Sequence, residues 1–101
     1  MIMLNIGCGT SLHSAWVNLD LAPLLPGVKA FDLRAGLPFA DGSVDVCYSS
    51  HVLEHLTAEE GVRFISEQRR VLRPGGVIRV VVPDLERIGR NYVRDLDDAL
   101  A

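Results

Sequence analysis

Short apolar runs separated by Gly, Pro, Asp and Ser recur along the chain, and this pattern predicts an α/β fold. The runs are rich in Val, Ile and Leu, with few charged positions. The predicted strands are Ile2–Ile6, Trp16–Leu21, Val28–Phe31, Val44–Ser49 and Val77–Val82.

A helix is predicted over Ala58–Leu72. Thr57 and Glu60 form a capping-box pattern at its start, and Pro74-Gly75-Gly76 is expected to end it. Its expected apolar stripe is Val62, Ile65 and Leu72.

A second helix is predicted after Asp84, a residue type that favours the N-cap position. Apolar residues then recur at helical spacing along one face. These residues are Leu85, Ile88, Tyr92, Leu96 and Leu100.

The segments between the first three predicted strands are short. Parallel neighbours normally need a crossover of about a dozen residues or more. Neither segment has room for a full helix, and the second contains Pro23, Pro26 and Gly27. We therefore expect these early crossovers to be loops or single turns, unless some of the strand assignments are wrong.

The composition limits the classes of function. The 101 residues are 49% hydrophobic with a formal net charge of −3, so we expect one domain, residues 1–101, and no general polyanion-binding surface. No apolar run is long enough to span a bilayer and no leader pattern is present, which favours a cytoplasmic protein without membrane or nucleic-acid partners. The two cysteines, Cys8 and Cys47, are expected to be free buried thiols.

The first strand stops at Gly7-Cys8-Gly9, and the second carries an acid at Asp20. A glycine turn after one strand and a carboxylate after the next is the layout of a nucleotide-type site. Taken alone, the glycine pair indicates only a tight turn. The dinucleotide fingerprint G-x-G-x-x-G fails, because Leu12 stands at the third glycine position, and NAD binding is therefore disfavoured.

Two longer stretches of the sequence indicate a family more specifically than the glycine turn does. They are LPFADGSVDVCYSSHVLEHL at residues 37–56 and RRVLRPGG at residues 69–76. With the glycine turn, they resemble the class I S-adenosylmethionine-dependent methyltransferases, in particular the broad small-molecule group called type 11. The resemblance runs from about Met3 to Asp84. It implies a Rossmann-like parallel sheet of about five strands in the order 3-2-1-4-5, with S-adenosylmethionine as cofactor and a small-molecule methyl acceptor.

The resemblance also implies a set of site residues. The main chain around Asn5, Gly7, Cys8 and Gly9 would line the methionine part of the cofactor. Asp20, with Leu21 beside it, would bind the ribose hydroxyls. Asp32 would accept from the adenine amino group, with Leu33 next to the ring. Ser49, Ser50 and His51 would lie near the transferred methyl, where His51 serves either as a general base or as a packing residue.

The chain departs from this family in two ways. The family usually has an acid where Asn5 stands, and often a third glycine where Ser11 stands. Its sheet normally continues with a sixth strand and an antiparallel seventh strand, which this chain lacks. We therefore expect a truncated or minimal version of the fold without the antiparallel C-terminal pair. A non-catalytic S-adenosylmethionine-binding or interaction module is the alternative function.

His51-Val52-Leu53-Glu54-His55 matches the H-x-x-E-H string of inverted zinc peptidases. Such sites need a long helix and a third ligand, for which Glu67 or Glu86 could serve. Because the string here follows a strand and stops at Thr57, where another helix begins, we expect no metal site.

The predicted topology leaves apolar surface open. Right-handed crossovers would place the early connections on one face of the sheet and the later helices on the other, so the first face should be thinly covered. Val77–Val82 would also be an apolar edge strand, a feature that promotes pairing with another chain. A two-fold homodimer would cover both surfaces.

Overall fold

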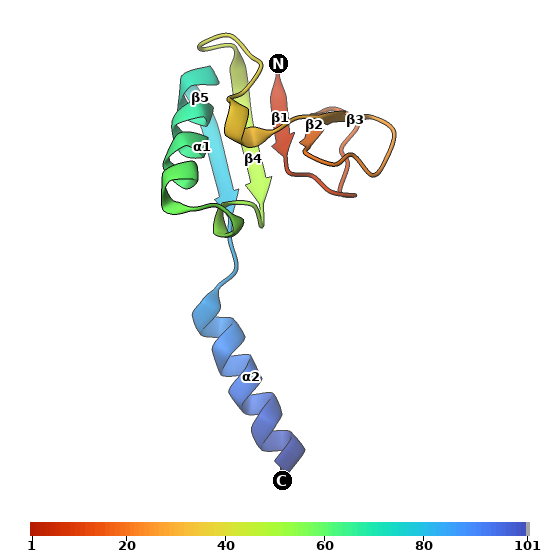
Figure 1. Cartoon of the computed structure of the whole chain (residues 1–101), viewed down its shortest axis with the longest axis vertical. Helices are drawn as coiled ribbons and strands as arrows, with labels where there is room; N and C mark the ends of the chain where they lie inside the picture. Colours follow the sequence, from red (N-terminus) through yellow and green to blue (C-terminus); the bar gives the residue numbers. More distant parts are fainter. Residues whose placement is uncertain (101) are drawn as a thin grey trace.

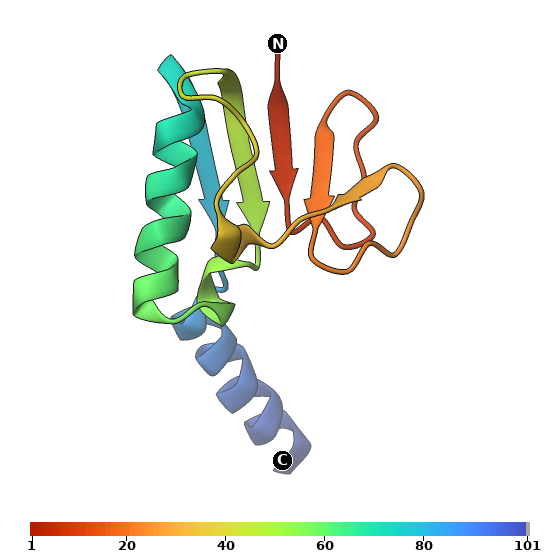
Figure 2. The ribbon, with the colours of Figure 1, turned by 45° about the horizontal axis from the view of Figure 1, so that its top comes forward.

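A five-stranded sheet with the order β3-β2-β1-β4-β5 is the centre of the computed structural model, which describes residues 1–100 apart from the side chain of Leu33. Every neighbouring pair of strands is parallel. The arrows of β1, β2, β4 and β5 run in one direction (Figure 2). The predicted α/β class, Rossmann-like sheet and strand order are therefore confirmed. The strands are β1 Met3–Ile6, β2 Val17–Asp20, β3 Val28–Ala30, β4 Val44–Ser50 and β5 Leu72–Val81.

Both predicted helices form, as α1 Ala58–Val71 and α2 Leu85–Leu100. The capping box of α1 is present: the Thr57 hydroxyl accepts from the Glu60 main-chain N–H at 3.2 Å, and the Glu60 carboxylate accepts from the Thr57 N–H at 3.0 Å. The Asp84 carboxylate accepts from the Arg87 N–H at 3.0 Å and caps α2. Two short 3₁₀ helices, η1 Leu33–Ala35 and η2 Leu53–His55, complete the elements.

The hydrophobic core lies between the sheet and α1. Its buried residues are Leu4, Ile6, Leu19, Leu37, Val44, Cys47, Phe64 and Val71. The predicted stripe of α1 is wrong, because Val62 and Ile65 are 67% and 36% exposed and Leu72 belongs to β5. The helix instead buries Gly61, Phe64, Gln68 and Val71. Because Gln68 is polar, the sequence pattern does not mark this buried face of α1 as apolar.

The fifth strand begins earlier than predicted. It starts at Leu72 and includes Pro74-Gly75-Gly76, with an irregular register opposite the segment between Val44 and Val46. A Cβ added at Gly76 would lie 2.9 Å from the Arg73 carbonyl oxygen and 3.1 Å from that of Asp45. The glycine therefore allows the two strands to approach each other.

The first two crossovers are loops, as predicted. Residues 7–16 and 21–27 contain no helix, and no helix of the described chain covers the sheet face opposite α1. The thin cover expected for this face is therefore confirmed. A hollow of about 400 Å³ opens on it. Its lining residues are His13, Trp16, Val46, Tyr48, Val77 and Arg79.

Helix α2 extends away from the sheet and covers neither face, so of the later helices expected on one face only α1 lies there (Figure 1). None of its residues is buried, and the molecule measures 57 × 29 × 23 Å. The predicted apolar stripe is present but exposed, from Leu85 at 79% to Leu96 at 45%. Strand β5 has no second partner within residues 1–100, as expected for an edge strand. Within those residues, neither helix combines the length and apolar character needed to cross a membrane.

Candidate functional site

The carboxyl ends of the parallel strands bring the predicted site residues to one edge of the sheet. The glycine turn follows β1, Asp20 ends β2, Asp32 follows β3, and Ser50 ends β4. In open parallel sheets, ligands bind at this edge, where the strand order reverses. Here the reversal lies between β1 and β4, which are adjacent in the sheet but not consecutive in the chain.

The glycine turn has a left-handed backbone at Gly7 and Gly9, with φ values of +67° and +55°. The main-chain N–H groups of Gly7 and Cys8 donate to the Leu19 carbonyl at 2.8 and 3.2 Å, which fixes the turn to β2. Apart from its two chain neighbours, a Cβ at Gly9 would meet no atom of the described chain within 4 Å. The main chain at Gly9 is therefore open to a ligand.

Asp20 is held by two main-chain groups. One carboxylate oxygen accepts from the Gly9 N–H at 2.8 Å, and the other accepts from the Ala22 N–H at 3.1 Å. A carboxylate has about four acceptor sites, so two remain for other donors. Leu21, directly after Asp20, is 58% exposed.

Asp32 is paired with Arg34, a partner that the sequence analysis missed. The Arg34 guanidinium donates to both Asp32 carboxylate oxygens, at 3.0 and 3.1 Å, and its main-chain N–H donates to one of them. These hydrogen bonds, the side-chain ones first, lower the pKa of Asp32. The Leu33 main chain begins η1, but its side chain lies outside the described structure.

The three residues at the end of β4 have different surroundings. Ser49 is fully buried on the core face, and its hydroxyl has no hydrogen-bond partner within the described residues. Only its main chain can contribute to a site at the sheet edge. Ser50 is partly exposed and His51 is exposed.

His51 has an unusual backbone for a residue with a side chain, with φ at +58°. Its N–H donates to the Val81 carbonyl at 2.8 Å, which ties this turn to the end of β5. Its Nδ1 lies 3.3 Å from a Glu54 carboxylate oxygen. Strained backbone at a non-glycine residue is often found at functional sites.

The H-x-x-E-H string does not lie on one helix. It begins at His51 after β4 and ends in η2, so the helical spacing that would place both histidines on one face is absent. Within residues 1–100, no group of three His, Cys, Asp or Glu side chains lies close enough to hold a metal ion.

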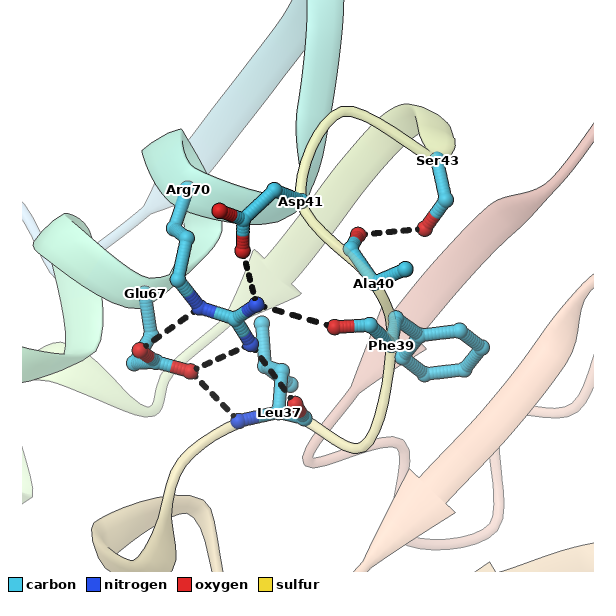
Figure 3. Close-up of polar contacts among 7 residues, drawn as sticks. All are labelled: Leu37, Phe39, Ala40, Asp41, Ser43, Glu67 and Arg70. Atoms are coloured by element: carbon cyan, nitrogen blue, oxygen red, sulfur yellow. Dashed lines mark hydrogen bonds and ion pairs between the residues drawn. The ribbon is translucent and has the colours of Figure 1, made fainter.

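Residues 37–56 and 69–76, the two stretches that carry the family resemblance, contact each other at Arg70 (Figure 3). Its guanidinium donates to the Leu37 and Phe39 carbonyls at 2.9 and 3.0 Å, and to the Asp41 carboxylate at 2.6 Å. It also pairs with Glu67, whose pKa is lowered mainly by this contact. Arg70 thus fastens residues 37–43 to α1, and the Glu67 carboxylate accepts from the Leu37 N–H at 2.7 Å.

Comparison with known proteins places this architecture in a family. The family model described as "Methyltransferase domain" matches residues 18–80. An uncharacterized methyltransferase of Mycolicibacterium gilvum is 56% identical over 75 residues, covering 65% of this chain and 29% of that protein. A probable S-adenosylmethionine-dependent methyltransferase of Mycolicibacterium smegmatis is 47% identical over 57 residues, covering 52% of this chain and 21% of that protein.

The fold also matches a solved structure, the trans-methyltransferase CalH in complex with SAH. The TM-score is 0.63 at 23% sequence identity, over 79% of this chain and 31% of CalH. The chain thus spans 21–31% of the length of these three proteins. Because the family model covers more than half of the 101 residues, the chain belongs to the methyltransferase domain family, of the class I S-adenosylmethionine-dependent type.

Proposed function

We propose that this chain binds S-adenosylmethionine at the carboxyl edge of its sheet and serves in methyl transfer to a small-molecule acceptor. The observation that carries the proposal is that the glycine turn and Asp20 are connected by a hydrogen bond at the carboxyl edge of the sheet. Two left-handed glycines open the main chain, and the Gly9 N–H fixes the carboxylate that ends β2.

The residues present fit the parts of this cofactor. The open space at Gly9 admits a ligand close to the main chain, and Asp20 keeps two acceptor sites that suit the two ribose hydroxyls. Asp32 is already bonded by Arg34, so its hydrogen bond to the adenine amino group would be the weaker contact. Asn5 is buried and brings no charge to the methionine end of the site.

When bound, S-adenosylmethionine would supply an electrophilic methyl group: the acceptor would attack the methyl carbon in line with the breaking S–C bond, and S-adenosylhomocysteine would leave. The protein's tasks are to align the acceptor and to exclude water. For an oxygen or nitrogen acceptor, His51 is the residue we assign as base. Its ring is exposed at the end of β4, and with Glu54 beside Nδ1, Nε2 is the nitrogen that would take the proton.

Calorimetric titration with S-adenosylmethionine and S-adenosylhomocysteine tests the proposal. We expect the parent chain to bind both and Asp20→Ala to bind both more weakly. Asp97→Ala, which removes an exposed acid of α2, is the matched control and should bind like the parent. If the parent binds neither compound, the proposed function is wrong.

The same titration separates the two candidate functions when an assay for methyl transfer to a pool of acceptors accompanies it. Transfer to a small molecule supports the enzyme. Binding of both compounds without transfer to any acceptor supports the non-catalytic module.

A further inference from the structure

Two buried asparagines, Asn5 of β1 and Asn18 of β2, lie opposite each other in the register of these strands. They are 3% and 6% exposed, on the sheet face that no helix of the described chain covers. Side chains alternate between the faces of a strand, and Leu4 and Ile6, on either side of Asn5, belong to the core. Buried amides at such positions require hydrogen-bond partners.

The main chain determines the orientation of the Asn18 amide. Its Nδ2 donates to the carbonyls of His13 and Trp16 at 3.0 and 3.1 Å, and a carbonyl oxygen can only accept. Its Oδ1 accepts from the His13 N–H at 3.2 Å. The oxygen of Asn18 is therefore the atom that meets Asn5.

This orientation makes position 5 a double donor. The Asn5 Nδ2 donates to Asn18 Oδ1 at 2.9 Å and to the Ser11 carbonyl at 2.8 Å. Both partners are acceptors, so both amide hydrogens are used. A carboxylate at this position would place negative charge against two acceptors and supply no hydrogen.

We propose that Asn5 and Asn18 are positioning residues that hold the segment Cys8–Trp16 in its ligand-binding shape, in place of a helix in this crossover. The Asn5–Ser11 bond closes the loop around the glycine turn, and Asn18 holds its second half at His13 and Trp16. An acid at position 5 would therefore be unfavourable in this chain. The part of this inference that concerns the ligand rests on the proposed function.

Asn5→Asp tests the pair, with Asn91→Asp as the matched control because Asn91 is exposed on α2. In native conditions, we expect Asn5→Asp to raise amide hydrogen exchange across residues 8–16 by about tenfold or more, since two hydrogen bonds are lost. Exchange in α1 should change much less. The side-chain amide protons of Asn5 in the parent should show slow exchange by nuclear magnetic resonance, and those of Asn91 fast exchange.

Titration with the cationic S-adenosylmethionine and the uncharged-sulfur S-adenosylhomocysteine separates positioning from charge. We expect Asn5→Asp to weaken both by a similar factor. Preferential tightening of S-adenosylmethionine, or parent-like exchange across residues 8–16, would overturn the inference. If the parent binds neither compound, the proposed function fails and the exchange measurement alone decides the role of the pair.

Asn5→Ala keeps the test decisive if Asn5→Asp does not fold. It removes both donors without adding charge and leaves the Asn18 bonds to His13 and Trp16. It should also raise exchange across residues 8–16. Unchanged exchange in this variant would likewise overturn the inference.

Discussion

Replacing Gly7 by alanine tests how the glycine turn and the end of β4 are joined. Gly7 has φ at +67°, and a Cβ at this position would lie 2.4 Å from Val52 Cγ2. The left-handed backbone costs about 1–2 kcal/mol for a residue with a side chain. Overpacking against Val52 adds about 1–3 kcal/mol. We therefore expect Gly7→Ala to lower the free energy of unfolding by about 2–5 kcal/mol.

Gly9→Ala is the matched control, because Gly9 has the same backbone handedness but, apart from its two chain neighbours, no atom of the described chain within 4 Å of an added Cβ. It should cost only the backbone strain, about 1–2 kcal/mol. Urea unfolding followed by the fluorescence of Trp16, the single tryptophan, measures both variants.

The double variant Gly7→Ala/Val52→Ala separates the two contributions. Once the Val52 methyls are removed, Gly7→Ala should cost no more than Gly9→Ala does. Equal costs for the two glycine substitutions in the parent would refute the steric argument. So would a cost at Gly7 that is independent of Val52.

Four further predictions use the same protein. Asp20→Ala should weaken S-adenosylmethionine binding by about 10- to 100-fold without unfolding the chain. Asp32→Ala should weaken binding less, because Arg34 competes for that carboxylate. Parent-like calorimetric titrations of both variants would show that the ribose and adenine assignments are wrong. His51→Ala should lower turnover more than cofactor affinity once an acceptor is identified, whereas an unchanged rate would assign His51 to packing. Hydrogen bonds lower the pKa values of four carboxyl groups. Arg34 lowers that of Asp32, the Ile2 N–H that of Asp45, the Thr57 N–H that of Glu60, and Arg70 that of Glu67. These hydrogen bonds therefore stabilise the folded state above about pH 4.5, and the stabilisation is lost as the pH falls through the folded-state pKa values. A series of urea unfolding midpoints at decreasing pH should show the loss. Midpoints that stay constant on acidification would contradict it. Light scattering should detect a dimer, because the edge of β5, the open sheet face and the apolar side of α2 are all exposed; a monomer at high concentration would show that no dimer forms.

The strands and the start of α1 could be predicted because each depends on a local pattern: an apolar run bounded by turn residues, or the capping box at Thr57 and Glu60. The strand order is not local, since β1 pairs with β4, and it was expected only from the resemblance to the methyltransferase family. The errors arose where tertiary structure overrides the local pattern. Gln68 lies fully buried on the core face of α1, and Pro74-Gly75-Gly76 lies within β5 rather than between elements.

The positions of Asp20 and Asp32 at the sheet edge follow from their places at strand ends, but their partners could not be predicted equally well. Arg34 is two residues from Asp32, and an N-cap acid followed by an arginine was a usable signal. Arg70 contacts Leu37 and Phe39 from 33 and 31 residues away. Such pairing depends on the packing of α1 on the sheet, which no local pattern specifies.

Two loops of this fold, one at the carboxyl edge that forms the site and one at the amino end of β4, are held by polar contacts where a helix would otherwise provide support. Arg70 fastens the loop before β4 to α1, and Asn18 fastens the loop after β1 to β2. Each side chain bonds main-chain carbonyls, so its effect depends on hydrogen-bond geometry rather than on the identity of the loop side chains. It follows that the loop residues themselves, such as Thr10 and Ser14, can vary with little effect on the site. Arg70 and Asn18 cannot be replaced by apolar residues of similar size without leaving carbonyl groups unpaired.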